Sequence, residues 1–257
     1  MKRLLVTLKY RGTNYVGWQV QQNGTSVQTA VQDAIEKLYG TRVDVTGCSR
    51  TDSGVHANGY RFCFTPPCET TPFKVIASLN HVLPDDMGVC DCIEVDEEFH
   101  PRYSAVAKEY VYKLYGGRAR DPFLNGLAWH YRGEPDVELM NSAAKHFIGK
   151  YDFCSFMAKG SKIIDTTRTV FDCRAEQKNG YVQISICGDG FLYKMVRIIV
   201  GTLIAVSEGK FTPSDIDRII AAKSRDAAGR TAPSEGLYLN RVFYDLKEVS
   251  EHVGKQL

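Results

Sequence analysis

The sequence has no apolar segment long enough to cross a membrane as a helix. Its longest apolar run, residues 198–206, is bracketed by Arg197 and Glu208 and is far shorter than the roughly 20 residues that a spanning helix needs. The basic start resembles that of a signal peptide, but Lys9 ends its apolar stretch and no small-residue cleavage site follows. We therefore expect a cytoplasmic protein without a membrane partner.

An excess of charge is also missing, since 32 Lys and Arg residues face 30 Asp and Glu residues among 257, for a net charge of +2. This balance excludes a disordered polyelectrolyte and a histone-like polycation. With 44% hydrophobic residues, the chain is typical of one large globular domain or two smaller ones.

A Cys-x-x-Cys pair is absent as well, and Cys90-Asp91-Cys92 is too tight to complete a zinc site with Cys63 and Cys68. A chain of this length can build a hydrophobic core without disulfides. We expect no metal site and expect all eight cysteines to be reduced and packed as small apolar residues. They are Cys48, Cys63, Cys68, Cys90, Cys92, Cys154, Cys173 and Cys187.

Apolar periodicity predicts an α+β protein of two similar units. In residues 1–105 the predicted order is strand, helix, strand, strand, helix, strand, which is the split βαβ or ferredoxin-like arrangement. Ser26 and Thr71-Pro72 are typical N-terminal helix signals, and Gly40 is a typical stop. The predicted strands are 2–10, 43–49, 59–64 and 88–95, and the helices are 26–40 and 71–84.

Residues 106–257 repeat this order and add one helix. A hairpin is predicted around Lys178-Asn179-Gly180. The predicted strands are 108–115, 167–174, 181–187 and 237–244, and the helices are 137–148, 192–207 and one that begins at Ser214.

The polar segment 47–57 joins two strands of the first unit and is too long for a tight hairpin. Its Thr, Asp, Ser and Gly residues are typical of a turn, so one interpretation is purely structural. In the other, Asp52 acts as nucleophile or acid–base, and Arg50 holds a phosphate or keeps the carboxylate ionised. His56 is a candidate base or an ordinary loop residue.

Arg197 is the only charge in the middle of a helix that is apolar on every side. We expect this helix to be buried, and Arg197 with it. A buried arginine requires a carboxylate, because an unpaired internal charge is costly. The ion pair has no catalytic meaning in one interpretation; in the other, its partner is Asp52 and the two units meet at one site.

Tyr110 and Tyr112 lie on one face of the strand that opens the second unit. Tyrosines at this spacing commonly pack in a core or on a sheet face. The alternative is a platform on which an extruded base stacks.

Eight motifs follow one another along nearly the whole chain. They are Gly17-Trp18-Gln19-Val20-Gln21, Thr25-Ser26-Val27-Gln28, Arg50-Thr51-Asp52-Ser53-Gly54-Val55-His56-Ala57, Leu79-Asn80 with Leu83-Pro84-Asp85-Asp86, Phe99-His100-Pro101-Arg102-Tyr103-Ser104-Ala105, Lys108-Glu109-Tyr110-Val111-Tyr112, Gly190-Phe191-Leu192 with Met195-Val196-Arg197 and Val200-Gly201, and Thr231-Ala232-Pro233 with Gly236-Leu237. In this order they resemble the TruA family of tRNA pseudouridine synthases. The chain departs from the family pattern at Cys48-Ser49 and Ser53.

The resemblance implies the pseudouridine synthase fold: two ferredoxin-like units forming a continuous antiparallel sheet flanked by helices, in a homodimer. It implies an isomerase that needs no cofactor and converts uridine to pseudouridine at positions 38–40 of the tRNA anticodon arm. On the matching positions, Asp52 is the catalytic aspartate, Arg197 pairs with it, Tyr110 packs on the target nucleotide and Arg50 helps to open the RNA stem. We count His56 among the substrate-binding candidates.

The reaction breaks the N1–C1′ bond and joins C5 to C1′. An ionised carboxylate suffices, either by attacking C1′ or by assisting proton removal from the sugar, and the sequence leaves both routes open. The alternative function is a non-catalytic RNA-binding ferredoxin-like module, which has no use for a carboxylate facing phosphates. A glycoside hydrolase would need a second carboxylate, and this segment offers none.

Charge is segregated along the sequence. Residues 85–98 carry seven acidic and no basic residues, whereas residues 99–120 carry five basic residues and one acidic residue. A solvated face explains such runs equally well. Because the basic run includes Tyr110, we expect a positive surface for phosphates around Asp52.

Overall fold

The computed structural model describes residues 2–178 and 180–254, which form two compact units. The first unit spans Met1–Val106 and Tyr238–Asp245, and the second spans Ala107–Leu237 and Leu246–Leu257. The sequence predicts a single boundary after residue 105 and places the last strand in the second unit. The structure instead groups Tyr238–Asp245 with the first unit.

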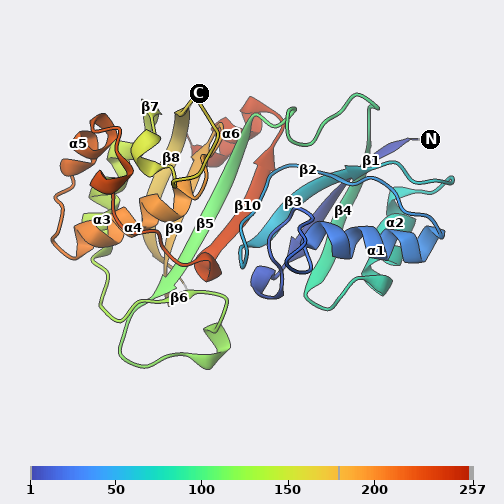
Figure 1. Cartoon of the computed structure of the whole chain (residues 1–257), viewed down its shortest axis with the longest axis horizontal. Coiled ribbons are helices and arrows are strands. Elements are labelled where there is room, and N and C mark those ends of the chain that lie inside the picture. Colours follow the sequence, from blue (N-terminus) through green and yellow to red (C-terminus); the bar gives the residue numbers. More distant parts are fainter. Residues whose placement is uncertain (1, 179, 255–257) are drawn as a thin grey trace. The chain divides into compact units, whose positions relative to one another are not determined.

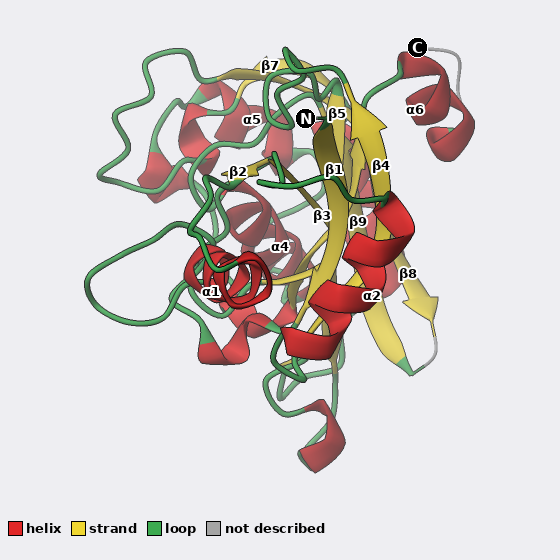
Figure 2. Cartoon of the chain, turned by 90° about the vertical axis from the view of Figure 1, so that its right-hand side faces the viewer, coloured by secondary structure: helices red, strands yellow, loops and turns green. Residues whose placement is uncertain are grey.

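The first unit has the predicted order of elements, which is confirmed. Strand β3 pairs with β1 and β1 with β4, all antiparallel, while the two-residue β2 pairs with β3. The late strand β10 runs parallel to β3, with Tyr238 opposite His56. Helices α1 and α2 contact each other, and α2 packs along β4 (Figure 2). The elements are β1 (Arg3–Tyr10), α1 (Val27–Tyr39), β2 (Thr46–Gly47), β3 (His56–Phe64), α2 (Pro72–Val82), β4 (Met87–Val95) and β10 (Leu237–Phe243) (Figure 1).

The helix ends of this unit follow local chemistry. The Ser26 hydroxyl accepts a hydrogen bond from the Thr29 backbone N–H at 3.0 Å, and Thr71 caps α2 in the same way through the Lys74 N–H. Gly40 ends α1 in the left-handed conformation, with φ of 71°. These caps satisfy groups that the first and last helical turns leave unpaired, so the predicted helix boundaries are confirmed.

Strand β2 is much shorter than the predicted strand over residues 43–49. The segment before it is bonded instead to two glutamine side chains of α1. The Gln28 side chain donates to the Val45 carbonyl at 3.0 Å, and the Gln32 side chain donates to the Val43 carbonyl at 3.2 Å. Only Thr46 and Gly47 pair with β3.

The second unit is built on the antiparallel strand order β5-β9-β8-β7, with β6 parallel to β5. Helices α3 and α4 pack together, with α3 against β8, and α6 lies across the sheet from them (Figure 2). Asn179 of the predicted hairpin turn lies outside the described residues. The elements are β5 (Ala107–Tyr115), β6 (Trp129–His130), α3 (Val137–Ala144), β7 (Gly149–Asp152), β8 (Thr167–Lys178), β9 (Tyr181–Gly188), α4 (Met195–Ser207), α5 (Asp215–Ala221) and α6 (Leu246–Val253).

Helix α4 is the core of this unit. Every residue from Ile198 to Val206 is buried, as predicted. The helix begins at Met195 rather than at residue 192, because Lys194 has a left-handed backbone with φ of 59°. Arg197 is only half-buried, so the prediction of a fully buried arginine is wrong.

Both units are mixed α and β, which confirms the α+β class. Among residues 2–178 and 180–254 there is no helix that is long and apolar enough to span a membrane. Short 3-10 helices occur at Gly12–Asn14, Pro122–Leu124, Lys145–Phe147, Cys154–Phe156, Arg225–Ala227 and Ser234–Gly236.

The cysteines divide into buried and accessible thiols. Burial raises the pKa of the Cys92 and Cys187 thiols to about 12, so these thiols stay protonated at neutral pH. Five cysteines pack in the core as predicted: Cys48, Cys63, Cys92, Cys173 and Cys187. Cys68 and Cys90 are exposed, so the packing prediction is wrong for them.

Candidate active site

Asp52 lies in the connection between β2 and β3, where it is half-buried. The connection turns directly after it, since the Val55 N–H donates to the Asp52 carbonyl at 3.2 Å and Gly54 has φ of 77°. The turn that the composition indicates is therefore present. It fixes the backbone of Asp52 and is compatible with a chemical role for the side chain.

The residues on both sides of Asp52 are tied to the last residue of β1 and to the chain that follows it. The Tyr10 hydroxyl and the Thr51 hydroxyl form a buried hydrogen bond of 2.9 Å. The Trp18 N–H donates to the Thr51 carbonyl, and the Gly54 N–H donates to the Tyr15 carbonyl, each at 3.2 Å. Together these bonds hold the Asp52 backbone on a rigid support.

Gly17 makes this close approach possible. Its φ is +107°, and a Cβ atom there would lie 2.4 Å from the Thr51 carbonyl oxygen. That distance is far inside van der Waals contact, so no larger residue fits without moving the Asp52 segment.

The start of the segment rests on aromatic rings. Trp18 stacks on Tyr60 with 4.0 Å between ring centroids, and the Tyr60 hydroxyl donates a short hydrogen bond to the Ser49 carbonyl. Cys48 is buried and its N–H donates to the Arg61 carbonyl at 2.8 Å. The departure from the family pattern at Cys48-Ser49 is thus accommodated by ordinary packing.

Arg50 projects from this segment and is exposed. In the part of the chain that the structure describes, its guanidinium forms no ion pair. An exposed arginine beside a fixed carboxylate is suited to contact an RNA phosphate.

His56 is not a loop residue, contrary to one of its two predicted settings. It is the first residue of β3 and is fully buried, and its ring stacks on Tyr238 at 4.6 Å between centroids. Its Nδ1 atom accepts a hydrogen bond from the Gly12 N–H at 2.9 Å. An accepting Nδ1 carries no proton, so this ring is neutral and supports the fold beside the Asp52 segment.

In the second unit, Tyr110 and Tyr112 stand on one face of β5, opposite Ile186 and Ile184 of β9. Both are buried, and Tyr110 packs edge-on against Phe191 at 5.0 Å. The Tyr112 hydroxyl donates to the Pro233 carbonyl at 2.8 Å. Burial raises the pKa of Tyr112 well above its ordinary value, so this phenol remains a donor.

Arg197 is anchored to the chain that precedes β10. Its Nε atom donates to the Ala232 carbonyl at 2.8 Å, and the Ala232 N–H donates to the Arg197 carbonyl at 2.9 Å. The positive charge of Arg197 opposes the rise in the pKa of Tyr112 that burial causes. The predicted ion pair between Arg197 and Asp52 stays a prediction.

The comparisons with known proteins identify the family to which the chain belongs. A family model described as tRNA pseudouridine synthase matches residues 7–104 and 143–245, which is well over half of the chain. The chain belongs to this family.

Several synthases of the family are similar to the chain over nearly its whole length. A tRNA pseudouridine synthase A of Ruminiclostridium cellulolyticum is 43% identical over 245 residues, covering 95% of this chain and 100% of its own. The enzyme of the same name from Caldicellulosiruptor saccharolyticus is 42% identical over 244 residues, with the same shares covered. That of Bacillus licheniformis is 42% identical over 245 residues, covering 95% of this chain and 99% of its own.

A solved structure titled as a Cbf5-Nop10-Gar1 complex aligns with 91% of this chain and 57% of that chain. Its TM-score is 0.34 and its identity 12%, values too low to support an argument. Membership in the synthase family, by contrast, decides against a non-catalytic RNA-binding module.

Sequence reasoning about this synthase missed the residues that support Arg197 and Tyr112. Ala232 and Pro233 act through backbone carbonyls, which no side-chain pattern reveals. The only signal in the sequence is that both belong to the motif Thr231-Ala232-Pro233. Within residues 2–178 and 180–254, no three His, Cys, Asp or Glu side chains are grouped as metal ligands.

Proposed function

We propose that this tRNA pseudouridine synthase modifies uridines at positions 38–40 of the anticodon arm, with Asp52 as the essential carboxylate. The family supplies the substrate class and the reaction, which is an isomerisation. The observation that carries the role of Asp52 is its support: the neighbouring Thr51 is fixed through both its hydroxyl and its carbonyl. Catalysis needs a carboxylate held in one place.

The other candidates have complementary roles in this proposal. Arg197 pairs with Asp52 and keeps it ionised. Tyr110 stacks on the extruded uracil, which offsets part of the few kcal/mol that base flipping costs. Arg50 contacts the phosphates of the opened stem, and His56, the buried first residue of β3, supports the substrate site by packing beside the Asp52 segment.

Two chemical routes use the same carboxylate. In one, Asp52 attacks C1′ as the N1–C1′ bond breaks. C5 of the rotated uracil then displaces the carboxylate from C1′, after which C5 loses its proton and N1 takes one up. In the other, Asp52 assists removal of a proton from the sugar. Both routes restore the free aspartate and need no cofactor.

We further propose a cytoplasmic homodimer with a positive surface around Asp52. The support for these points is the resemblance to the TruA family and the basic run over residues 99–120. Sedimentation velocity tests the dimer: a monomer at micromolar concentration would contradict it.

Asp52→Asn tests the central assignment. We expect tritium release from C5-labelled tRNA to fall below detection, while tRNA binding in a filter assay stays within about twofold of wild type. Asp44→Asn, at an exposed aspartate of the same unit, is the matched control and keeps full activity. Turnover by Asp52→Asn would refute the assignment.

Mass spectrometric mapping of the product tests the substrate positions. We expect pseudouridine at one or more of positions 38, 39 and 40. A product confined to other stems would leave the family reaction intact but contradict the proposed site choice.

A further inference from the structure

A pocket in the second unit has no role in the chemistry described above. It has a volume of about 500 Å³ and is lined by β6, the chain after it, Glu208 beyond α4, and Arg230. This size is within the range of pockets that hold a small ligand or one nucleotide of a larger one.

The floor of the pocket is aromatic and carries a stacked guanidinium. Arg230 lies over the ring of Trp129, with 5.1 Å from Cζ to the centroid, and Tyr131 packs edge-on against Trp129 at 5.7 Å. Trp129 is buried, whereas 58% of the Arg230 side chain is exposed. One face of the guanidinium is therefore held by the indole, its Nη2 atom lies 3.6 Å from a carboxylate oxygen of Glu208, and more than half of the side chain stays accessible. This arrangement orders an arginine for phosphate recognition at low entropic cost.

The charge of the pocket is positive. Its acidic residue, Glu208, is paired with Lys210 at 2.7 Å and with Arg230 at 3.6 Å, and it accepts a hydrogen bond from the Tyr131 hydroxyl at 3.0 Å. The hydrogen bond from Lys210 is the main cause of the lowered pKa of Glu208, so this carboxylate is ionised and already neutralised. Arg132 and Arg230 supply the remaining charge.

The pocket shares its supports with the catalytic candidates of the same unit. Trp129 packs edge-on against Tyr112 at 6.2 Å, and Tyr112 is two residues from Tyr110 on the same face of β5. The Arg230 carbonyl lies against α4 at Gly201, one helical turn beyond Arg197. The pocket is therefore separated from Tyr110 only by Tyr112.

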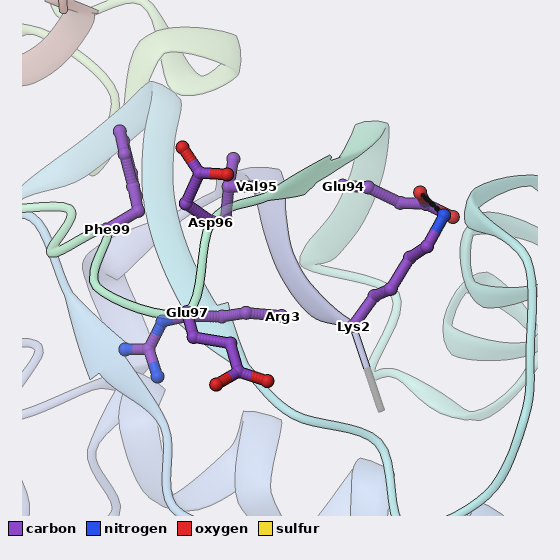
Figure 3. A pocket seen from close by; sticks show the side chains of 7 residues that line it. All are labelled: Lys2, Arg3, Glu94, Val95, Asp96, Glu97 and Phe99. Atoms are coloured by element: carbon purple, nitrogen blue, oxygen red, sulfur yellow. Dashed lines mark hydrogen bonds and ion pairs between the residues drawn. The ribbon is translucent and has the colours of Figure 1, made fainter.

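The pocket of the first unit offers a contrast (Figure 3). It has a volume of about 650 Å³, and its carboxylates come from Glu94, Asp96 and Glu97. Lys2 pairs with Glu94, which leaves the lining with more negative than positive charge around Arg3. Phosphates would be repelled there and attracted to the pocket at Trp129.

We propose that the pocket at Trp129 binds a backbone phosphate of the tRNA, held by the guanidinium groups of Arg132 and Arg230. The inference rests on the proposed function, because it takes tRNA as the substrate. It assigns to Arg230 a role in substrate binding, with Trp129 as the positioning residue that orients it.

Arg230→Gln tests the proposal. Loss of a charged phosphate contact raises the KM for tRNA by roughly tenfold. The plot of log K for tRNA binding against log salt concentration has a negative slope, and the magnitude of this slope falls by about one. Arg230→Lys restores the slope because the charge returns. Arg218→Gln is the control, since Arg218 is an exposed arginine of α5 whose side chain is 74% exposed, and it changes neither quantity.

Two results would overturn the proposal. One is a wild-type KM and salt slope in Arg230→Gln. The other is an unchanged slope with an altered sedimentation coefficient, which would make the pocket a protein contact. If wild-type protein binds tRNA but forms no pseudouridine, the proposed function fails, while the salt slopes of tRNA binding still decide the role of the pocket.

Discussion

The Asp52 segment and helix α4 place their functional side chains by opposite means. Asp52 sits in irregular chain that is held through Thr51 and Gly54 by hydrogen bonds to the end of β1 and to the irregular chain that follows it. Arg197 sits on a regular helix whose following turns are wholly buried. Local hydrogen bonds therefore fix the backbone of Asp52. The position of Arg197 depends instead on the packing of the core of its unit.

The two regions share one device, a glycine that admits a neighbouring carbonyl. Gly17 faces the Thr51 carbonyl, and Gly201 faces the Arg230 carbonyl. Because one contact lies between irregular segments and the other on a core helix, filling the two positions should separate activity from stability. Loops can yield locally, whereas packed cores transmit strain.

The largest effect is expected from Gly201→Ala. The new Cβ would lie 1.7 Å from the Arg230 carbonyl oxygen, so the chain from Gly229 to Ala232 must leave α4 and release Arg197. We expect a loss of about 3 kcal/mol in the free energy of unfolding, although alanine by itself favours a helix by about 1 kcal/mol. Urea denaturation followed by circular dichroism measures it.

Gly209→Ala is the control for this variant. Gly209 follows α4 with φ of +71° and has no atom within 4 Å of a built Cβ, so only backbone strain of about 1 kcal/mol is expected. Equal stability of the two variants would show that the contact between Gly201 and Arg230 contributes nothing.

Sequence patterns predicted the features of the fold that depend on residues close together in the chain. The caps of α1 and α2 and the buried face of α4 follow from residues within a turn or two of each other. What the patterns missed depends on residues distant in the chain: the glutamines of α1 that bond to the segment before β2, and the parallel pairing that brings β10 to His56. The left-handed Lys194 that delays α4 has no signal in its residue type.

For the site, the sequence predicted which side chains matter but not what holds them. Asp52, Tyr110 and Arg197 stand out by type and position. Their supports are backbone groups of Thr51, Pro233 and Ala232, and any residue type provides a carbonyl, so only coordinates reveal them.

Gly17→Ala is expected to have the next largest effect, on activity rather than on stability. The new Cβ would lie 2.4 Å from the Thr51 carbonyl oxygen at a backbone φ of +107°, so the Asp52 segment must shift. Since a displacement of about 1 Å can cost a factor of 100 in rate, we expect kcat to fall at least tenfold. Single-turnover kinetics with saturating enzyme measure it.

The stability of Gly17→Ala should fall by less than that of Gly201→Ala, because loop backbone can relax. Gly40→Ala has the same kind of strain, with φ of +71° and no atom within 4 Å of the built Cβ, and keeps wild-type kcat. A Gly17→Ala enzyme with normal kcat would show that the Asp52 carboxylate tolerates a displaced backbone.

The smallest effect is expected from Tyr112→Phe, which removes one hydroxyl from the supports of Arg197. The Pro233 carbonyl loses the donor that lies 2.8 Å away, and a buried acceptor left without a partner costs about 1–2 kcal/mol. Tyr181→Phe, at a β9 hydroxyl with no hydrogen bond to any described residue, should cost less. Thermal unfolding compares the pair. If Tyr112→Phe lowers kcat without lowering stability, the chain before β10 affects activity alone, as expected for the Asp52 segment. In that case only α4 differs from the Asp52 segment in how it positions its side chain.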